Sequence, residues 1–170
     1  MKRIYILRHA KSAWASPGSG DIDRPLNARG EHQANLLQNW FSSCEQRPNA
    51  IVCSPSRRTL ETYEGIKSAL TDSSFSIDDK LFHGALEDYL QAIWSLDDSH
   101  GAAMIIGHNP TCDELTRYLA IPSSSAYERL MANHFGTANL AVLDADLASW
   151  SEIGSASCSV EAVIRPKDLE

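Results

Sequence analysis

Three short segments of the chain carry guanidinium and imidazole side chains directly after an apolar run. They are Arg8-His9-Ala10-Lys11, Ser54-Pro55-Ser56-Arg57-Arg58-Thr59 and Gly107-His108-Asn109-Pro110. Arginine presents a planar fork of N–H donors that matches phosphate oxygens two at a time, and a neutral imidazole can act as a nucleophile or carry a proton. Together, these residue types are suited to binding an oxyanion and to chemistry on a phosphoryl group.

Each segment also has an ordinary structural interpretation. An Arg-His pair occurs by chance, His108 could be a hydrogen-bonded loop residue, and Arg57 or Arg58 could lie on a solvated helix face. The occurrence of all three segments after apolar runs favours the functional interpretation. The remaining histidines lack such a context and are predicted to be structural or exposed: His32, His83, His100 and His134.

The apolar runs before these segments are typical of buried strands. Strands are predicted at Ile4–Leu7, Ala50–Cys53 and Ala102–Ile106, with two more, nearer the sheet edge, at Leu140–Leu143 and Ser159–Ile164. Apolar residues at helical spacing lie between them, in four stripes: Ala34 to Phe41, Leu60 to Leu70, Leu86 to Trp94 and Leu115 to Leu119. This alternation predicts an α/β three-layer sandwich, with a mostly parallel central sheet flanked by helices.

Capping residues, prolines and glycines indicate where helices and loops begin. Asn27 is a predicted N-cap, and Ser54-Pro55 and Asn109-Pro110 each place a capping residue before a proline, which predicts two helix starts. Helix N-termini and ligands gather at the carboxyl ends of parallel strands, so the three basic segments should share one edge. Serine- and glycine-rich stretches predict loops at Ser16–Gly20, Thr71–Ser76 and Ser123–Ser125.

Length and charge limit the classes of protein. The 170 residues predict a single domain over residues 1–170. Fifteen Lys and Arg against 22 Asp and Glu give a net charge of −7, which argues against a nucleic-acid or membrane partner. Any anion must therefore be held by a local positive cluster. Four scattered cysteines and a short N-terminal apolar run predict a reduced, cytoplasmic protein without a zinc site or signal peptide.

Four motifs, in this order, resemble those of the histidine phosphatase superfamily. The motifs are Leu7 to Ser12, Asp21 to Gly30, Ser54 to Thr62 and Gly107 to Pro110, and the similarity extends from residue 3 to about residue 145. Within the superfamily, the chain is most similar to the short SixA-type phosphohistidine phosphatases. The resemblance implies the phosphoglycerate-mutase-like fold.

The resemblance also implies roles for individual residues. His9 would be the nucleophile, with Arg8 and Arg58 binding the phosphate and His108 as a second catalytic imidazole on the phosphoryl oxygens. Arg58 is preferred to Arg57 because its spacing back from Thr62 fits the family motif. Arg24 resembles a further phosphate contact of the short members.

The general acid is the point at which the chain departs from the family pattern. Members acting on phosphate esters have a clear glutamate after the third strand, and here the matching region is Leu81 to Asp88. Glu87 is the candidate catalytic acid. Its alternative role is that of a helix-face carboxylate in a first turn, where it suits the helix dipole.

These inferences predict a metal-independent phosphatase, without a cofactor, that forms a phosphohistidine intermediate. A chain of this length has little left to build a lid, so the site should be open. The protein is expected to be a monomer. Such a site suits a phosphorylated protein, most of all protein phosphohistidine, or a small phosphate compound. The alternatives are a small-molecule phosphomonoesterase and, from another class, a non-catalytic phosphate-binding module.

Overall fold

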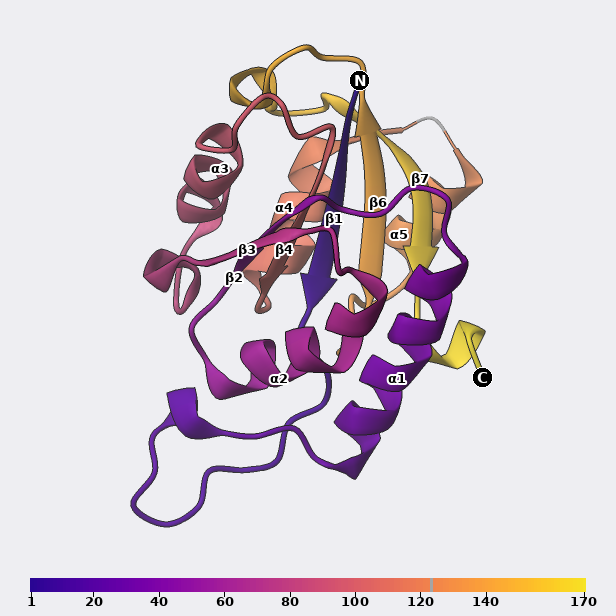
Figure 1. Ribbon diagram of the computed structural model, residues 1–170. Coiled ribbons are helices and arrows are strands. Elements are labelled where there is room, and N and C mark those ends of the chain that lie inside the picture. The colour runs from indigo at the N-terminus through magenta and orange to yellow at the C-terminus, as the bar shows by residue number, and fades with distance from the viewer. Residues whose placement is uncertain (123) are drawn as a thin grey trace.

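A seven-stranded sheet runs through the middle of the protein in the computed structural model, which describes residues 1–122 and 124–170 (Figure 1). The spatial order of the strands is β3-β2-β4-β1-β6-β7-β5. Their bounds are β1 Lys2–Arg8, β2 Ala50–Cys53, β3 Ser74–Ile77, β4 Ala102–Gly107, β5 Ala120–Ile121, β6 Leu140–Ala145 and β7 Cys158–Ile164. All five predicted strands are therefore present, and β6 and β7 lie toward one side of the sheet as expected.

Strand direction places the ends of three strands at one edge. β1 pairs in parallel with β4, with Arg8 opposite Gly107, and β4 pairs in parallel with β2. Only β6 among the described strands runs antiparallel to its neighbours, β1 and β7. The prediction of a mostly parallel sheet is confirmed, and the three basic segments leave it at neighbouring positions.

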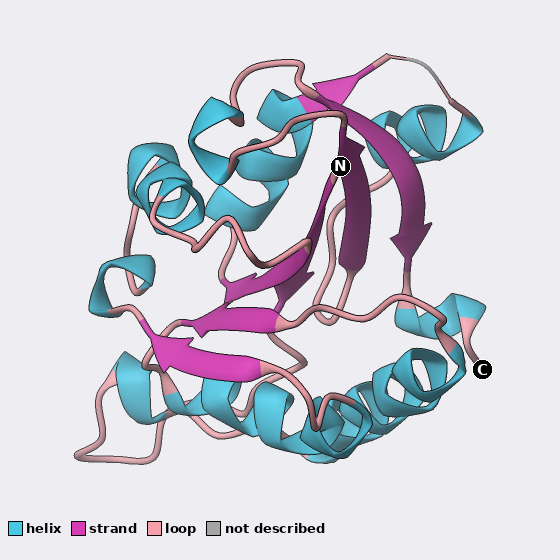
Figure 2. Ribbon diagram, turned by 45° about the horizontal axis from the view of Figure 1, so that its top comes forward, coloured by secondary structure: helices cyan, strands magenta, loops and turns pink. Residues whose placement is uncertain are grey.

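Helices cover both faces of the sheet (Figure 2). One layer contains α1 (Ala28–Ser43) and α2 (Arg57–Ile66), and the other contains α3 (Leu86–Trp94), α4 (Thr111–Leu119) and α5 (Ser125–Ala132). Successive residues of β1 alternate between two cores: Ile4 and Ile6 pack in one, and Tyr5 and Leu7 in the other. This period of two is what a strand covered on both faces requires, and the predicted three-layer sandwich is confirmed.

The helix starts differ in detail from the predictions. Asn27 caps α1 as predicted, because its side chain accepts from Gly30 N at 2.9 Å. The cap of α2 is Ser56 rather than Ser54, and α4 begins at Thr111, one residue after Pro110. Ser54 and Asn109 do not cap, since their side chains bond to groups in other segments, described below.

Two of the predicted loops also contain regular structure. Ser74–Ile77 forms the edge strand β3, whose four residues are all exposed and which pairs on one side only, with β2. Ser125 opens α5, which Ser124 caps, and Ser123 lies outside the described residues. Ser16–Gly20 is a loop as predicted. Within the described chain, no helix is both long enough and apolar enough to cross a bilayer.

Candidate active site

The ends of β1 and β4 bring the two histidine segments side by side. His9 N donates to Gly107 O at 3.0 Å, so the parallel pairing continues one residue beyond β1. The His9 and His108 ring centroids lie 5.3 Å apart. Arg58, the second residue of α2, reaches the same point and donates from Nε to His9 Nε2 at 3.3 Å. The predicted meeting of the three basic segments is therefore seen in the structure.

The hydrogen bonds of His9 define its reactive nitrogen. Nδ1 lies 2.7 Å from Ala10 O, and because a carbonyl oxygen can only accept, Nδ1 carries the proton. Nε2 therefore keeps its lone pair. Burial, followed by the charges of the nearby arginines, lowers the pKa of His9 to about 4. The imidazole is neutral near pH 7, as a nitrogen nucleophile must be.

Arg58 is held in place by Asp21, a residue of the short 3-10 helix Asp21–Asp23. Arg58 Nη1 donates to Asp21 O at 2.8 Å, and Nη2 donates to Asp21 Oδ2 at 3.1 Å. The Arg58 side chain is buried, whereas Arg57 is exposed and pairs with Glu61 at 2.8 Å. The tandem arginines therefore face in different directions, and Arg58 faces His9.

Arg24 reaches this cluster through Asp21. Its Nη1 donates to Asp21 Oδ1 at 3.0 Å, and its other donors go to Ser12 Oγ and Ala13 O. The guanidinium also lies 5.2 Å from the ring centre of the exposed Trp14. Arg24 thus holds Ser12, Ala13 and Asp21 together, and its link to Arg58 runs through Asp21.

Two buried nitrogens beside His9 have no partner among the described residues. They are Arg8 Nε and His108 Nδ1. Arg8 donates from Nη1 to Phe135 O at 3.1 Å, and His108 Nε2 lies 2.7 Å from Ser54 Oγ. Burial and nearby His9 and Arg58 lower the pKa of His108 to about 3. A buried polar atom without a hydrogen-bond partner lowers the stability of the fold. Unpartnered nitrogens such as Arg8 Nε and His108 Nδ1 are typical of a site that binds an anion.

An open pocket of about 520 Å³ adjoins these groups. Arg58 and His108 line it together with Phe82, His83 and Glu114. The Phe82 ring meets His108 edge-on, with 5.7 Å between ring centres. The described residues include no group of three or more His, Cys, Asp or Glu placed to hold a metal ion. The arrangement can bind a phosphoryl group and present the lone pair of His9 to it.

Comparison with known proteins decides the family. The model of the histidine phosphatase superfamily (branch 1) matches residues 4–89, half of the chain. The chain belongs to the histidine phosphatase superfamily. It is therefore a hydrolase of the phosphatase class.

The chain is also similar, over most of its length, to a curated relative and to solved structures. An uncharacterized protein of Mycobacterium tuberculosis is 29% identical over 151 residues, covering 86% of this chain and 91% of the relative. The crystal structure of a protein assigned as the phosphohistidine phosphatase SixA of Agrobacterium tumefaciens is 27% identical, with a TM-score of 0.81 and coverage of 97% of this chain and 98% of that one. A second SixA-assigned structure, from Nakamurella multipartitia, gives 24% identity and a TM-score of 0.84 over 97% and 96% of the two chains. Within the superfamily, the similarity is to the SixA type.

The histidine phosphatase site contains groups that the sequence analysis did not assign. Asp21 was part of a quoted motif, but its bonds to Arg58 and Arg24 were not foreseen. Ser54 was interpreted as a helix cap and instead contacts His108. His83 lines the pocket, although its sequence context gave no role. The available signal for Asp21 was an acidic residue in the same family motif as Arg24.

The structure does not bring Glu87 to the pocket. Glu87 is exposed in the first turn of α3, and it is absent from the pocket lining. The carboxylates that line the pocket are Asp21, which is paired with arginines, and Glu114 in the first turn of α4. The placement of Glu87 matches its alternative role as a helix-face carboxylate near a positive helix end.

Proposed function

We propose that this phosphatase acts on protein phosphohistidine through a covalent intermediate on His9. The observation that carries the proposal is the 2.7 Å contact between His9 Nδ1 and Ala10 O, which requires the proton on Nδ1 and leaves the Nε2 lone pair beside Arg58. Nε2 would attack phosphorus as the bond from phosphorus to the substrate nitrogen breaks. Arg8, Arg58 and His108 would stabilise the negative charge on the equatorial oxygens.

The second half of the reaction consumes water. A water molecule attacks phosphorus, the bond to His9 Nε2 breaks, and inorganic phosphate leaves. The net reaction is phosphohistidine plus water giving histidine plus phosphate, so no oxidant, reductant or further substrate is needed. Imidazole is an easy leaving group because its nitrogens are basic near neutral pH, whereas an alkoxide needs a proton from a general acid.

Support for a phosphoramidate substrate comes from the carboxylates around the site. Asp21 is bound to Arg58 and Arg24, which lowers its pKa, and Glu114 is exposed. Asp21 is therefore held ionised, and an ionised carboxylate cannot give a proton to an alkoxide. The similarity to structures assigned as SixA phosphohistidine phosphatases supports the same substrate. The open pocket would admit a side chain on a protein surface.

The test compares three substrates and identifies the intermediate. Protein phosphohistidine should be hydrolysed well, p-nitrophenyl phosphate modestly and an alkyl phosphate poorly. Mass spectrometry of the acid-labile adduct should locate the phosphoryl group on His9. A strong preference for the alkyl phosphate would overturn the substrate assignment, and binding of phosphate without any turnover would indicate a phosphate-binding module.

A small-molecule phosphomonoesterase is the second candidate, favoured by Glu114 in the pocket lining. If Glu114 supplies the proton, Glu114→Gln should lower alkyl-ester hydrolysis about a hundredfold and leave phosphohistidine hydrolysis within twofold. Glu87→Gln is the matched variant and tests the original expectation for that residue. Loss of alkyl-ester hydrolysis in Glu87→Gln alone would return the acid role to Glu87.

A further inference from the structure

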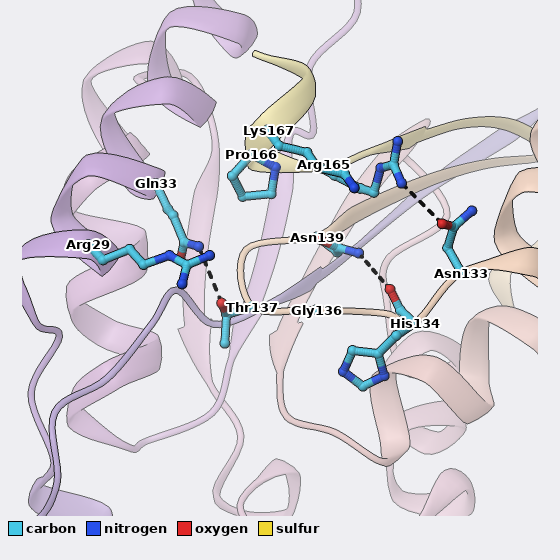
Figure 3. Close-up of a pocket in the computed structure, with 10 residues that line it drawn as sticks. All are labelled: Arg29, Gln33, Asn133, His134, Gly136, Thr137, Asn139, Arg165, Pro166 and Lys167. Carbon is cyan, nitrogen blue, oxygen red and sulfur yellow. Dashed lines mark hydrogen bonds between the residues drawn. The ribbon is translucent and has the colours of Figure 1, made fainter. Parts of the chain in front are cut away.

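A second pocket, of about 290 Å³, opens beside the histidine cluster and is lined by basic side chains (Figure 3). Arg29 from α1 lies on one side, and Arg165 and Lys167 from the segment after β7 lie on the other. The residues between them belong to the segment 133–139, which leads into β6. In a chain of net charge −7, the lining of this pocket contains three Arg or Lys side chains and no carboxylate.

Most of this positive charge is free to act on a ligand. Arg165 is partly neutralised, since its Nη2 contacts Asp168 Oδ1 at 3.0 Å, and Asp168 also binds Arg129. Arg29 and Lys167 are exposed, and neither has a carboxylate of the described residues within ion-pair distance. Two uncompensated cations therefore flank the pocket.

The position of Arg29 is not explained by helix stability. It is the second residue of α1, at the positive end of the helix dipole, where a cation is unfavourable. Its guanidinium lies near the Gln33 and Thr137 side chains, which bond to each other at 3.3 Å. Helix end and cation together raise the positive potential of the pocket, which suits an incoming anion.

The segment 133–139 lines the basic pocket and also makes hydrogen bonds to residues of the candidate active site. Phe135 O accepts from Arg8 Nη1 at 3.1 Å and from Asn109 Nδ2 at 2.7 Å. Ala138 N donates to the carbonyl oxygens of Arg8 and His9. Gly136, Thr137 and Asn139 of the same segment line the basic pocket. An extended substrate polypeptide that crosses this segment would therefore pass from one site to the other within a few residues, at about 3.3 Å per residue.

We propose that this basic pocket binds acidic side chains that flank the phosphorylated residue of a protein substrate. The proposal rests on the proposed function, because it assumes a polypeptide substrate at His9. A small phosphate compound would fill the catalytic pocket without reaching Arg29 or Lys167. The basic pocket therefore selects among phosphoproteins by the carboxylates near the phosphorylated position, with little effect on small substrates.

The test uses peptides that carry a non-hydrolysable phosphonate analogue of phosphohistidine. One peptide has glutamates on both flanks, and its partner has glutamines. Each is measured as an inhibitor of p-nitrophenyl phosphate hydrolysis by the full chain. The wild-type protein should bind the glutamate peptide about fivefold more tightly, as expected for exposed ion pairs, and the preference should shrink as ionic strength rises to about 0.5 M.

Two double variants test whether the preference for the glutamate peptide arises in the basic pocket. Arg29→Gln/Lys167→Gln should reduce the ratio of the two inhibition constants to below about twofold, and its turnover of p-nitrophenyl phosphate should stay within about twofold of wild type. Arg57→Gln/Lys67→Gln is the matched control: it removes the same charge from exposed cations paired with Glu61 and Glu64, and it should keep the preference.

The peptide measurements test the role of the basic pocket, and turnover of phosphohistidine tests the proposed function. Equal inhibition by the two peptides, or a preference that survives in Arg29→Gln/Lys167→Gln, would overturn the pocket assignment. Loss of the preference in the control variant would overturn it too, by assigning the effect to net charge. Failure to hydrolyse phosphohistidine would overturn the proposed substrate alone, since inhibition does not depend on that turnover.

Discussion

At the scale of single residues, the reactivity of His9 depends on which nitrogen holds the proton and on whether the ring is neutral. Both are set by neighbours: Ala10 O fixes the Nδ1 proton, and burial with three arginines disfavours the imidazolium. A histidine in water would be partly protonated near its ordinary pKa of about 6.5. The fold thus holds His9, the proposed nucleophile, in its neutral form over the physiological range.

His9→Ala is expected to lower kcat by about a thousandfold or more, because it removes the proposed nucleophile. The variant should still fold, which circular dichroism and the melting temperature can check. Retention of more than about a hundredth of the wild-type rate would contradict the covalent mechanism.

Arg58→Ala should lower kcat/KM by about a hundredfold or more, whereas Arg57→Ala should change it less than threefold. Arg58 is buried against His9 and Asp21, and Arg57 is exposed beside Glu61. Steady-state kinetics with p-nitrophenyl phosphate measures both. Similar losses in the two variants would show that the orientation of the tandem arginines has no functional meaning.

The lowered pKa of His9 also affects stability. Between its folded pKa of about 4 and an unfolded value near 6.5, the unfolded chain binds more protons, so the free energy of unfolding falls as pH falls through this window. Below both values, the effect is complete. His9→Asn should therefore flatten the pH dependence of stability between about pH 6.5 and 4, measured by urea denaturation. An unchanged slope would mean that His9 is protonated normally in the folded state.

At the scale of elements, the end of β4 depends on close packing against α3. Tyr89 of α3 is buried, and its hydroxyl accepts from His108 N at 2.9 Å and donates to Leu81 O at 3.1 Å. A Cβ built at Gly107 would lie 2.3 Å from Tyr89 Oη, so only glycine fits there. The glycine before His108 therefore serves to position the histidine through Tyr89.

Gly107→Ala should lower the free energy of unfolding by about 1–3 kcal/mol and reduce kcat, because Tyr89 and the His108 backbone must move apart. Gly101→Ala, just before β4, is the control, since a Cβ there meets nothing within 4 Å. Chemical denaturation and turnover of the two variants give the comparison. A neutral Gly107→Ala would show that Tyr89 can shift without displacing His108.

At the scale of the whole molecule, sheet topology assembles the site. Because β2, β4 and β1 are adjacent and parallel, residues that lie about 50 positions apart in the chain meet at one edge. The two cores on either side of the sheet hold that edge in place. A tetrahedral oxyanion bound there should stabilise the folded chain as a whole by mass action.

Tungstate at about a hundredfold its dissociation constant should add about 2.7 kcal/mol to stability and raise the melting temperature by several degrees. Arg58→Ala should abolish most of this shift, because the proposed function makes the guanidinium a main oxyanion contact.

An excess of chelator should leave phosphatase activity unchanged. Activity lost in chelator and restored by a divalent metal would contradict the metal-independent mechanism.

Local patterns in the sequence determined five of the seven described strands, most helices, the basic segments and their common edge. Apolar periodicity, capping residues and motif spacing depend on near neighbours, so they can be seen without a structure. The family resemblance added roles for His9, Arg8, Arg58 and His108.

Tertiary structure alone decided which distant groups touch. Asp21 meets Arg58, 37 positions away, and Ser54 meets His108, 54 positions away, whereas Glu87 stays outside the pocket that Glu114 lines. The basic pocket likewise joins Arg29 to Lys167 across almost the whole chain. Such contacts depend on the path of each loop and the rotation of each helix about its axis. Spacing along one segment contains no information about either.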